Sequence, residues 1–397
     1  MKKLHIADTT QVRAGDVTDV YFLRTEKVLR AKGKSRHVCM EVFLKSYPDP
    51  RYGWAVFAGL EEVCTLLEGR HVTVHALPEG SIFFTNEPVM TIEGDYLDFG
   101  VLETAVLGCL CQASGIATKA SRCRVACGTK GLISFGARRM HPSIAPMVER
   151  SAFIGGCDGV ATVASARLIG ESPIGTMPHA LILLMGDTVS AALAFDEVVE
   201  HEVPRIVLID TFDDEKYAAV SVAEALGDKL LGVRLDTPAS RRGNFRALLQ
   251  EVRWELDLRG FRHVKLYVSG GLDLQDILAL QDTVDSFGVG TQLSSASTLD
   301  YSMDIVEIGG RPFAKRGKMS GKKTVLRCRK CMKDYVVPQG FQKKCDCAGK
   351  TSPVLKKIVE EGKITTDLPS ARQIRSHALD ELARLRQDTP AKEFLGL

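Results

Sequence analysis

Seven short apolar runs between residue 131 and about residue 290 constrain the fold more than any other feature of the chain. Each run precedes a helix-like segment, and its apolar residues are continuous rather than alternating, as in parallel strands covered on both faces. Some seven βα units in succession predict a closed or nearly closed parallel sheet rather than an open doubly wound one. The runs are Leu132–Phe135, Gly159–Val163, Pro173–Thr176, Arg205–Asp210, Gly232–Asp236, Val264–Ser269 and Ser286–Val289.

Residues 1–112 show a different pattern. Alternating runs such as His71–His75 and Ser81–Thr85, separated by Pro78-Glu79-Gly80, predict an antiparallel or mixed sheet. Leu102–Ala126 follows as a long, apolar, helix-compatible connector. Because 397 residues exceed one ordinary core, we expect more than one domain. The expected bounds are 1–112, 113–300 and 301–397.

The charge of the chain is unevenly distributed. From Arg311 onward there are 21 Lys and Arg against 9 Asp and Glu, whereas residues 1–310 have 31 against 40. A basic tail is compatible with nucleic acid, a phosphate-rich substrate or an acidic neighbouring subunit. Within this tail, Ser370–Arg386 has helical periodicity and opens with a serine, a common first residue of helices.

The cysteine content indicates a reducing compartment. Eleven cysteines are an odd number scattered through a long chain, which fits reduced thiols better than a disulfide framework. The start of the chain has no apolar run typical of a signal peptide, and no uninterrupted apolar stretch approaches the length of a membrane helix. We therefore expect a cytoplasmic protein with no membrane partner.

Four of the cysteines form a cluster, Cys328-x-x-Cys331 and Cys345-x-Cys347. Two close pairs of thiolates are what a tetrahedral zinc site takes from a short segment. Four free surface cysteines are the weaker interpretation. Four thiolates leave no open coordination position, so the zinc is expected to be structural.

Two glycine-rich turns end neighbouring strands. Val268-Ser-Gly-Gly-Leu272 and Phe287-Gly-Val-Gly-Thr291 offer backbone N–H groups without Cβ obstruction. One such turn often only connects a strand to a helix. Two in succession favour a single phosphate group held between them, as in many phosphate-binding barrels.

Polar residues end several other strands. Asp210 and Asp236 each close an apolar run, where a carboxylate is costly unless it binds hydroxyls, a metal or a cation. A helix cap is an equally good interpretation of Asp210 alone, and Arg234 lies on the same side of its strand as Asp236 and can neutralise it. His179 opens an apolar helix and is either a cap or a phosphoryl acceptor.

Together, in order, these motifs resemble the nicotinate phosphoribosyltransferase family, in its compact archaeal-type form with a four-cysteine tail. The resemblance implies an α/β protein: an incomplete (β/α) barrel with an N-terminal α/β sandwich-like domain and a small C-terminal zinc-binding domain. The motifs are Asp19-Val-Tyr-Phe, Phe135-Gly-Ala-Arg-Arg-Met-His-Pro, Gly175-Thr-Met-Pro-His, Val233-Arg-Leu-Asp-Thr, Val268-Ser-Gly-Gly and Phe287-Gly-Val-Gly-Thr.

The resemblance also implies a homodimer with shared active sites, with room for a higher oligomer. Tyr21 of one subunit and Phe135 of the other would sandwich the pyridine ring. His179 matches the family histidine that ATP phosphorylates, and it is an expected catalytic residue together with Arg234 and Asp236. The further substrate-binding residues would be Arg138 and Arg139 for anionic groups, Asp210 for the ribose and pyrophosphate, and Ser269, Gly270, Gly271, Gly288, Gly290 and Thr291 for the 5′-phosphate.

The implied substrates are nicotinate, phosphoribosyl pyrophosphate and ATP, with Mg²⁺ at the pyrophosphate and structural Zn²⁺ on the cysteines. Thr237-Pro238 stands where many relatives have an acidic residue, so the metal ligands at the active site stay open. Other interpretations are a nicotinamide or quinolinate phosphoribosyltransferase, or a phosphosugar isomerase or aldolase. A Schiff-base aldolase would need a lysine near the middle of a strand, whereas Lys265 starts its strand and so lies at the wrong end. A nucleic-acid binding protein is a minor alternative, because the tail has few aromatics for stacking.

Overall fold

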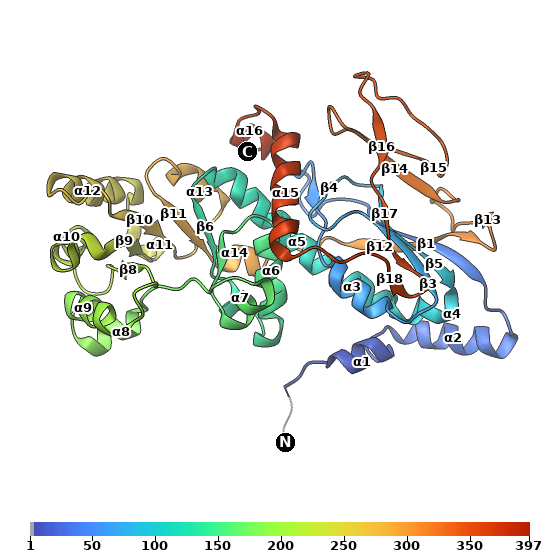
Figure 1. Cartoon of the computed structure of the whole chain (residues 1–397), viewed down its shortest axis with the longest axis horizontal. Coiled ribbons are helices and arrows are strands. Elements are labelled where there is room, and N and C mark those ends of the chain that lie inside the picture. The colour runs from blue at the N-terminus through green and yellow to red at the C-terminus, as the bar shows by residue number, and fades with distance from the viewer. Residues whose placement is uncertain (1–3) are drawn as a thin grey trace. The chain divides into compact units, whose positions relative to one another are not determined.

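Two large sheets organise the chain, whose computed structural model describes residues 4–397 (Figure 1). The chain divides into two compact units. One unit takes the residues up to Thr118 together with Ser297–Leu397, and the other is Lys119–Ala296. Each unit is built around its own sheet.

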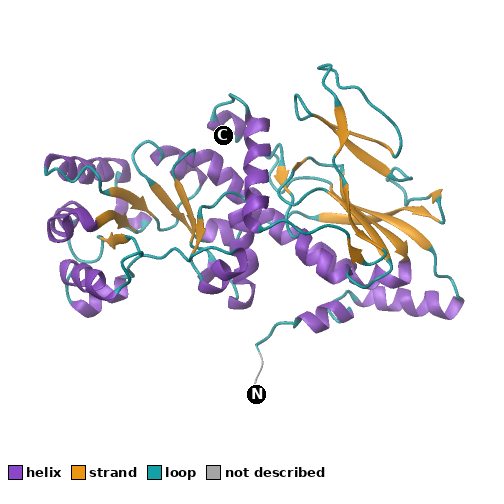
Figure 2. Cartoon of the chain, viewed as in Figure 1, coloured by secondary structure: helices purple, strands orange, loops and turns teal. Residues whose placement is uncertain are grey.

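The unit Lys119–Ala296 is built on a six-stranded sheet in which every pair of neighbours is parallel, in the order β7-β6-β11-β10-β9-β8. All four residues of β8 and of β11 are buried, because helices cover the sheet (Figure 2). The strands are β6 (Gly131–Ser134), β7 (Gly159–Val160), β8 (Arg205–Leu208), β9 (Leu230–Leu235), β10 (Lys265–Val268) and β11 (Ser286–Val289).

This sheet is a curled, open half-barrel, which confirms the predicted α/β class and incomplete closure. Helices follow the strands as the βα pattern predicts. They are α6 (Ala145–Ile154), α7 (Val163–Ile169), α8 (His179–Met185), α9 (Thr188–Val198), α10 (Glu215–Leu226), α11 (Ala239–Arg242), α12 (Phe245–Leu258), α13 (Leu274–Leu280) and α14 (Thr291–Ser294).

One predicted strand is wrong. Pro173–Thr176 is not a strand but an extended connection between α7 and α8. Ile174 donates its N–H to the carbonyl of Val160 at 2.8 Å, whereas Pro173 has no N–H to offer a ladder. The run therefore lies beside the edge strand β7 without extending the sheet, and six strands, not seven, form it.

The other unit contains a seven-stranded antiparallel sheet in the order β13-β12-β1-β5-β3-β17-β18. In β3, Val72, Val74 and Ala76 are buried while Thr73 and His75 are half-buried, so one face lies on the core, as the alternation predicts. The strands are β1 (His37–Leu44), β3 (Val72–Ala76), β5 (Pro88–Asp95), β12 (Tyr301–Ile308), β13 (Arg311–Pro312), β17 (Lys356–Glu360) and β18 (Lys363–Ile364).

Helices and a short strand pair complete this unit. The serine predicted to open the last long helix caps it: the Ser370 hydroxyl accepts the N–H of Gln373, and the Gln373 side chain accepts the N–H of Ser370. The elements are β2 (Ala55–Val56), β4 (Ile82–Phe83), α1 (Thr9–Ala14), α2 (Val20–Lys32), α3 (Leu60–Leu67), α4 (Tyr96–Phe99), α5 (Glu103–Cys127), α15 (Ala371–Arg386) and α16 (Ala391–Phe394).

Helix α5 is the predicted long connector. By length and composition, the helical stretch Tyr96–Cys127 is apolar enough to cross a membrane, but 56% of its most apolar window is buried inside the protein. Residues on α5 such as Leu110, Ile116 and Ala117 are fully buried. A core helix of a soluble protein has the same properties.

The basic tail is not separate from the N-terminal region. Strand β17 pairs with β3, and β12 pairs with β1, so strands from residues 1–112 and 301–397 share one sheet. The four cysteines lie beside a three-stranded sheet of β14 (Lys323–Cys328), β15 (Asp334–Pro338) and β16 (Thr351–Pro353). The division into three domains at residues 112 and 300 stays a prediction.

Candidate functional site

A cavity of about 350 Å³ lies at the carboxyl ends of the parallel strands, the edge where such sheets bind ligands. It is lined by residues in or just after the ends of β6, β7, β9, β10 and β11 and by the connection that precedes α8. Eleven of the residues predicted for the site line it: Phe135, Arg138, Arg139, Arg234, Asp236, Ser269, Gly270, Gly271, Gly288, Gly290 and Thr291.

The first glycine turn requires glycine. Gly270 and Gly271 have φ of 92° and 73°, values that side chains disfavour. A Cβ on Gly270 would also lie 2.9 Å from the carbonyl oxygen of Asp236. The Ser269 hydroxyl donates to Oδ1 of Asp236 at 2.7 Å, which ties this turn to the end of β9.

Gly288, on the next strand, makes room for a ring. A Cβ there would approach Cε2 of Phe135 to 2.4 Å, so the glycine lets the Phe135 ring lie against β11. The guanidinium of Arg234 lies over the Phe135 ring, 5.8 Å from the ring centre. Burial lowers the pKa of Arg234 from its ordinary value, while the nearby carboxylates of Asp236 and Asp210 oppose that change.

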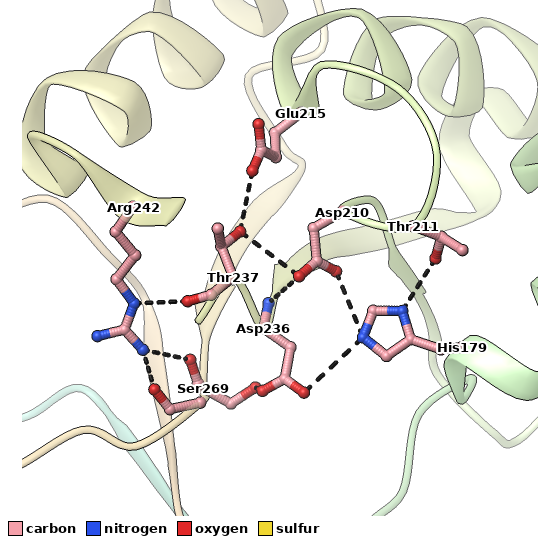
Figure 3. A network of polar contacts seen from close by, with 9 residues as sticks. His179, Asp210, Thr211, Glu215, Asp236, Thr237, Arg242 and Ser269 are labelled. Atoms are coloured by element: carbon pink, nitrogen blue, oxygen red, sulfur yellow. Dashed lines mark hydrogen bonds and ion pairs between the residues drawn. The ribbon is translucent and has the colours of Figure 1, made fainter. Parts of the chain in front are cut away.

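His179 belongs to a polar network that joins several strand ends (Figure 3). Its Nε2 lies 3.8 Å from Oδ1 of Asp210 and 3.9 Å from Oδ2 of Asp236, and its Nδ1 lies 3.0 Å from the hydroxyl of Thr211. The Asp236 N–H donates to Oδ2 of Asp210 at 3.1 Å. Burial raises the pKa of Asp210, so its negative charge benefits from a cation beside it.

His179 and Asp210 thus adjoin the cavity through Asp236, although neither lines it. Tyr21 lies on α2 in the other unit, and the residue is 55% exposed. It is therefore available to a neighbouring molecule.

Sequence reasoning missed several residues. Arg242 donates from Nε to the Thr237 carbonyl at 2.6 Å and from Nη2 to the carbonyls of Ser269 and Gly270. Glu149 is fully buried and accepts the N–H of Thr162 at 3.1 Å. An arginine pair after the strand end, Arg241-Arg242, was the only available signal, and it does not indicate which arginine turns inward.

The four cysteine thiols converge. The Sγ atoms of Cys328, Cys331, Cys345 and Cys347 all lie within 4.8 Å of one another, and Cys328 Sγ is 3.5 Å from Cys347 Sγ. Four sulfurs at the usual Zn–S distance of about 2.3 Å from one metal lie within this range of each other. The cluster can therefore bind a metal such as zinc.

Comparisons with known proteins agree with this geometry. Residues 19–114 match the family described as quinolinate phosphoribosyl transferase, N-terminal domain, and residues 116–304 match its C-terminal domain. The nicotinate phosphoribosyltransferase pncB1 of Mycobacterium tuberculosis is 32% identical over 355 residues, which cover 79% of this chain and 78% of that protein. The nicotinate phosphoribosyltransferase of Bacillus subtilis is 29% identical, covering 70% of this chain and 63% of that protein.

Two solved structures are also similar to this chain. The nicotinate-nucleotide pyrophosphorylase from Pyrococcus furiosus is 53% identical and superposes with a TM-score of 0.95 over 98% of this chain and all of that one. Human nicotinic acid phosphoribosyltransferase is 19% identical and has a TM-score of 0.75 over 94% of each chain, a likeness in fold.

Proposed function

The chain belongs to the nicotinate phosphoribosyltransferase family, and we propose that the cavity at the strand ends of the half-barrel is its active site. The enzyme forms nicotinate mononucleotide and pyrophosphate from nicotinate and phosphoribosyl pyrophosphate, in NAD biosynthesis. We place the active site in this cavity because two glycine turns and three arginines, Arg138, Arg139 and Arg234, line it together.

The 5′-phosphate of the ribosyl donor belongs, in this proposal, between the two glycine turns. Ser269, Gly270 and Gly271 supply one side, and Gly288, Gly290 and Thr291 supply the other. Backbone N–H groups and a hydroxyl are suited to phosphate oxygens. The strands fix their spacing, which a loop alone would not do.

Nicotinate would lie against Phe135, whose ring lies close to Gly288 and 5.8 Å from the Arg234 guanidinium. The pyridine nitrogen donates its lone pair to the anomeric carbon, a C–N bond forms, and the C–O bond to pyrophosphate breaks with its electron pair leaving on pyrophosphate. Positive charge develops on the ribose ring, so positioning and electrostatics dominate catalysis. Asp236 offers negative charge to the ribose, and Arg234, with Arg138 and Arg139, offers positive charge to the anions.

His179 is proposed as the phosphoryl acceptor that couples the transfer to ATP. When Nδ1 donates its proton to the Thr211 hydroxyl, Nε2 keeps the lone pair that attacks the γ-phosphate. The N–P bond forms as the P–O bond to ADP breaks. A phosphorylated Nε2 beside Asp210 and Asp236 would be repelled by both carboxylates, so a cation must accompany it.

The carboxylates of Asp210 and Asp236 fit that cation. Oδ1 of Asp210 is buried and has no hydrogen-bond partner among residues 4–397, and carboxylate oxygens are ligands that Mg²⁺ prefers. Mg²⁺ would supply positive charge to the leaving pyrophosphate. The resemblance implies an acidic residue where Thr237-Pro238 stands, and the Thr237 hydroxyl donates to Glu215 at 2.9 Å. The two aspartates are therefore the candidates.

The four-cysteine cluster is proposed to hold structural Zn²⁺ in a small C-terminal zinc-binding domain. Cys328 and Cys345 are buried, and the Tyr335 hydroxyl donates to Sγ of Cys345 at 3.3 Å. Such a bond stabilises a thiolate ligand. Free cysteines throughout the chain also support a cytoplasmic location.

One assay tests this assignment: product formation from phosphoribosyl pyrophosphate and Mg²⁺ with nicotinate, nicotinamide or quinolinate, each with and without ATP. We expect product from nicotinate and stimulation by ATP. Quinolinate is the competing base, because the matched domain descriptions name it. Product from quinolinate or nicotinamide but none from nicotinate would overturn the specificity.

A further inference from the structure

Arg242 makes more contacts to the first glycine turn than any predicted residue. From the end of α11, its Nη2 reaches the carbonyl of Ser269 at 3.3 Å and the carbonyl of Gly270, while its Nε holds the carbonyl of Thr237 (Figure 3). Its guanidinium also lies 4.9 Å from the ring centre of Phe245, the buried first residue of α12. One side chain therefore joins the loops that follow β9 and β10.

These contacts determine where the amides of the turn point. In a trans peptide, C=O and N–H point in opposite directions. The carbonyl of Ser269 shares its peptide with the N–H of Gly270, and the carbonyl of Gly270 shares its peptide with the N–H of Gly271. Because Arg242 binds both carbonyls, both N–H groups face away from it. Across residues 4–397, neither N–H donates to a backbone carbonyl, so both remain available to a ligand of the cavity.

Arg242 also brings a positive charge to the turn. Among residues 4–397, its three hydrogen-bond acceptors are carbonyl oxygens. A cation held behind a row of N–H groups adds to the attraction of that row for an anion.

We propose that Arg242 is a positioning residue that orients the Gly270 and Gly271 amides toward the 5′-phosphate of the ribosyl donor. It acts through the backbone of the turn and does not line the cavity. The role needs arginine, because a planar fork bridges carbonyls on two loops, whereas the ammonium of lysine offers a compact point charge. This inference rests on the proposed site.

The test uses the full-length enzyme with Arg242→Ala and Arg242→Lys, and Arg241→Ala as the matched control. Arg241 is the exposed neighbour of Arg242 on the same short helix. Two titrations are compared: the Kd for ribose 5-phosphate by calorimetry, and the KM values for phosphoribosyl pyrophosphate and for nicotinate. Thermal midpoints are measured for every variant.

We expect Arg242→Ala to raise the Kd for ribose 5-phosphate and the KM for phosphoribosyl pyrophosphate about tenfold or more, since hydrogen bonds to a charged group are lost from the turn. The KM for nicotinate and the thermal midpoint should change little, Arg241→Ala should match the wild type, and Arg242→Lys should resemble Arg242→Ala. Added guanidinium ion at low concentration should restore part of the affinity of Arg242→Ala for ribose 5-phosphate.

An unchanged Kd for ribose 5-phosphate in Arg242→Ala would overturn the role. So would a parallel rise of both KM values with a lower thermal midpoint in both Arg242 variants, because that pattern marks general destabilisation. If the wild-type enzyme converts nicotinate while these variants do not differ from it, only this inference fails. If the wild type makes no nucleotide from any of the three bases, the proposed function fails instead.

Discussion

At the scale of single residues, His179 is the side chain whose surroundings decide its chemistry. Two carboxylates lie within 4 Å of Nε2, and the Thr211 hydroxyl lies 3.0 Å from Nδ1. In the proposed role, Nδ1 holds the ring proton and Nε2 carries the lone pair that reacts. The carboxylates would repel an incoming phosphate, so the role also needs a cation between them and the phosphate.

Replacing His179 with alanine should abolish ATP stimulation while a basal rate of nucleotide formation remains, because the transfer to nicotinate does not use the imidazole. The rate with and without ATP at fixed phosphoribosyl pyrophosphate measures this. Thr211→Val, which removes only the partner of Nδ1, should reduce the stimulation without abolishing it. Undiminished stimulation in His179→Ala would rule out a phosphohistidine at this position.

Gly288 is the second residue with a defined steric role. In Gly288→Ala the new methyl would meet the Phe135 ring at 2.4 Å and the Ser269 Cβ at 3.1 Å, so the ring must move from its place beside Arg234. We expect the KM for nicotinate to rise about tenfold, since a small displacement of a positioned substrate is costly. Gly53→Ala, where the added methyl meets nothing within 4 Å, is the control. An unaltered KM for nicotinate in Gly288→Ala would remove Phe135 from the base site.

At the scale of elements, local sequence patterns correctly predicted strands and helix starts that depend on local contacts. Continuous apolar runs identified six strands of the half-barrel, and Ser370 correctly marked the start of α15. The prediction of a strand at Pro173–Thr176 was wrong, because an extended connecting segment can have the same apolar composition as a strand. The two differ only in their ladder hydrogen bonds. Arg242 was missed for a related reason: its partners are backbone carbonyls, which have no sequence signature.

The cysteine cluster should stabilise the three-stranded sheet that carries it. Cys328 ends β14, and β14 is the central strand between β15 and β16. Removing the metal with a chelator, or replacing Cys328 with serine, should lower the thermal midpoint by about 5 °C or more. Nucleotide formation below that midpoint should continue, because no cysteine of the cluster lines the strand-end cavity. Metal analysis should give one zinc per chain. A protein without bound metal but with full stability would contradict the structural role.

A buried carboxyl pair near this sheet gives a pH-dependent stability. Burial raises the pKa of Glu87 to about 9, and the adjacent carboxylate of Asp334 adds to the increase. The folded protein therefore holds a proton on Glu87 that the unfolded chain releases above its ordinary pKa of 4.5. For a group whose folded pKa is raised, stability is highest below the unfolded pKa and falls as pH rises toward the folded one.

Glu87→Gln removes this proton linkage, since an amide does not ionise and still accepts the Phe84 N–H that Glu87 accepts at 2.8 Å. Between pH 5 and pH 8, the free energy of unfolding of the wild type should fall relative to that of Glu87→Gln by at most about 1.4 kcal/mol per pH unit. Its thermal midpoint should fall with it. Thermal denaturation of both proteins across this range is the measurement. Parallel curves would mean that Glu87 is ionised in the folded protein.

At the scale of the whole molecule, sequence patterns do not show which distant segments pair. Strand β17 joins β3 across some 280 residues of chain, with Lys357 opposite His75, so the tail contributes a strand to the first sheet. No local pattern encodes such a partner, because the pairing depends on which edge strand is free in the folded state. In the same way, no local pattern near Tyr21 encodes which subunit's cavity this residue serves.

The family resemblance implies a homodimer with shared sites, in which Tyr21 of one subunit would serve the Phe135 cavity of the other. Tyr21→Ala and Arg138→Ala should each inactivate the homodimer. Each site would take Arg138 from one subunit and Tyr21 from the other, so either change removes a side chain from every site. When the two variants are co-expressed, a mixed dimer has one site with both lesions and one intact site. Random assembly makes half of the dimers mixed, and the mixture should recover about a quarter of wild-type activity.

Co-expression of Arg138→Ala with Phe135→Ala is the matched control. Both lesions lie in the same cavity, so every site in the mixture carries at least one of them and no activity should return. If Tyr21→Ala with Arg138→Ala also recovers nothing, Tyr21 serves its own subunit or none. Recovery in the first mixture alone assigns Tyr21 to the partner's cavity.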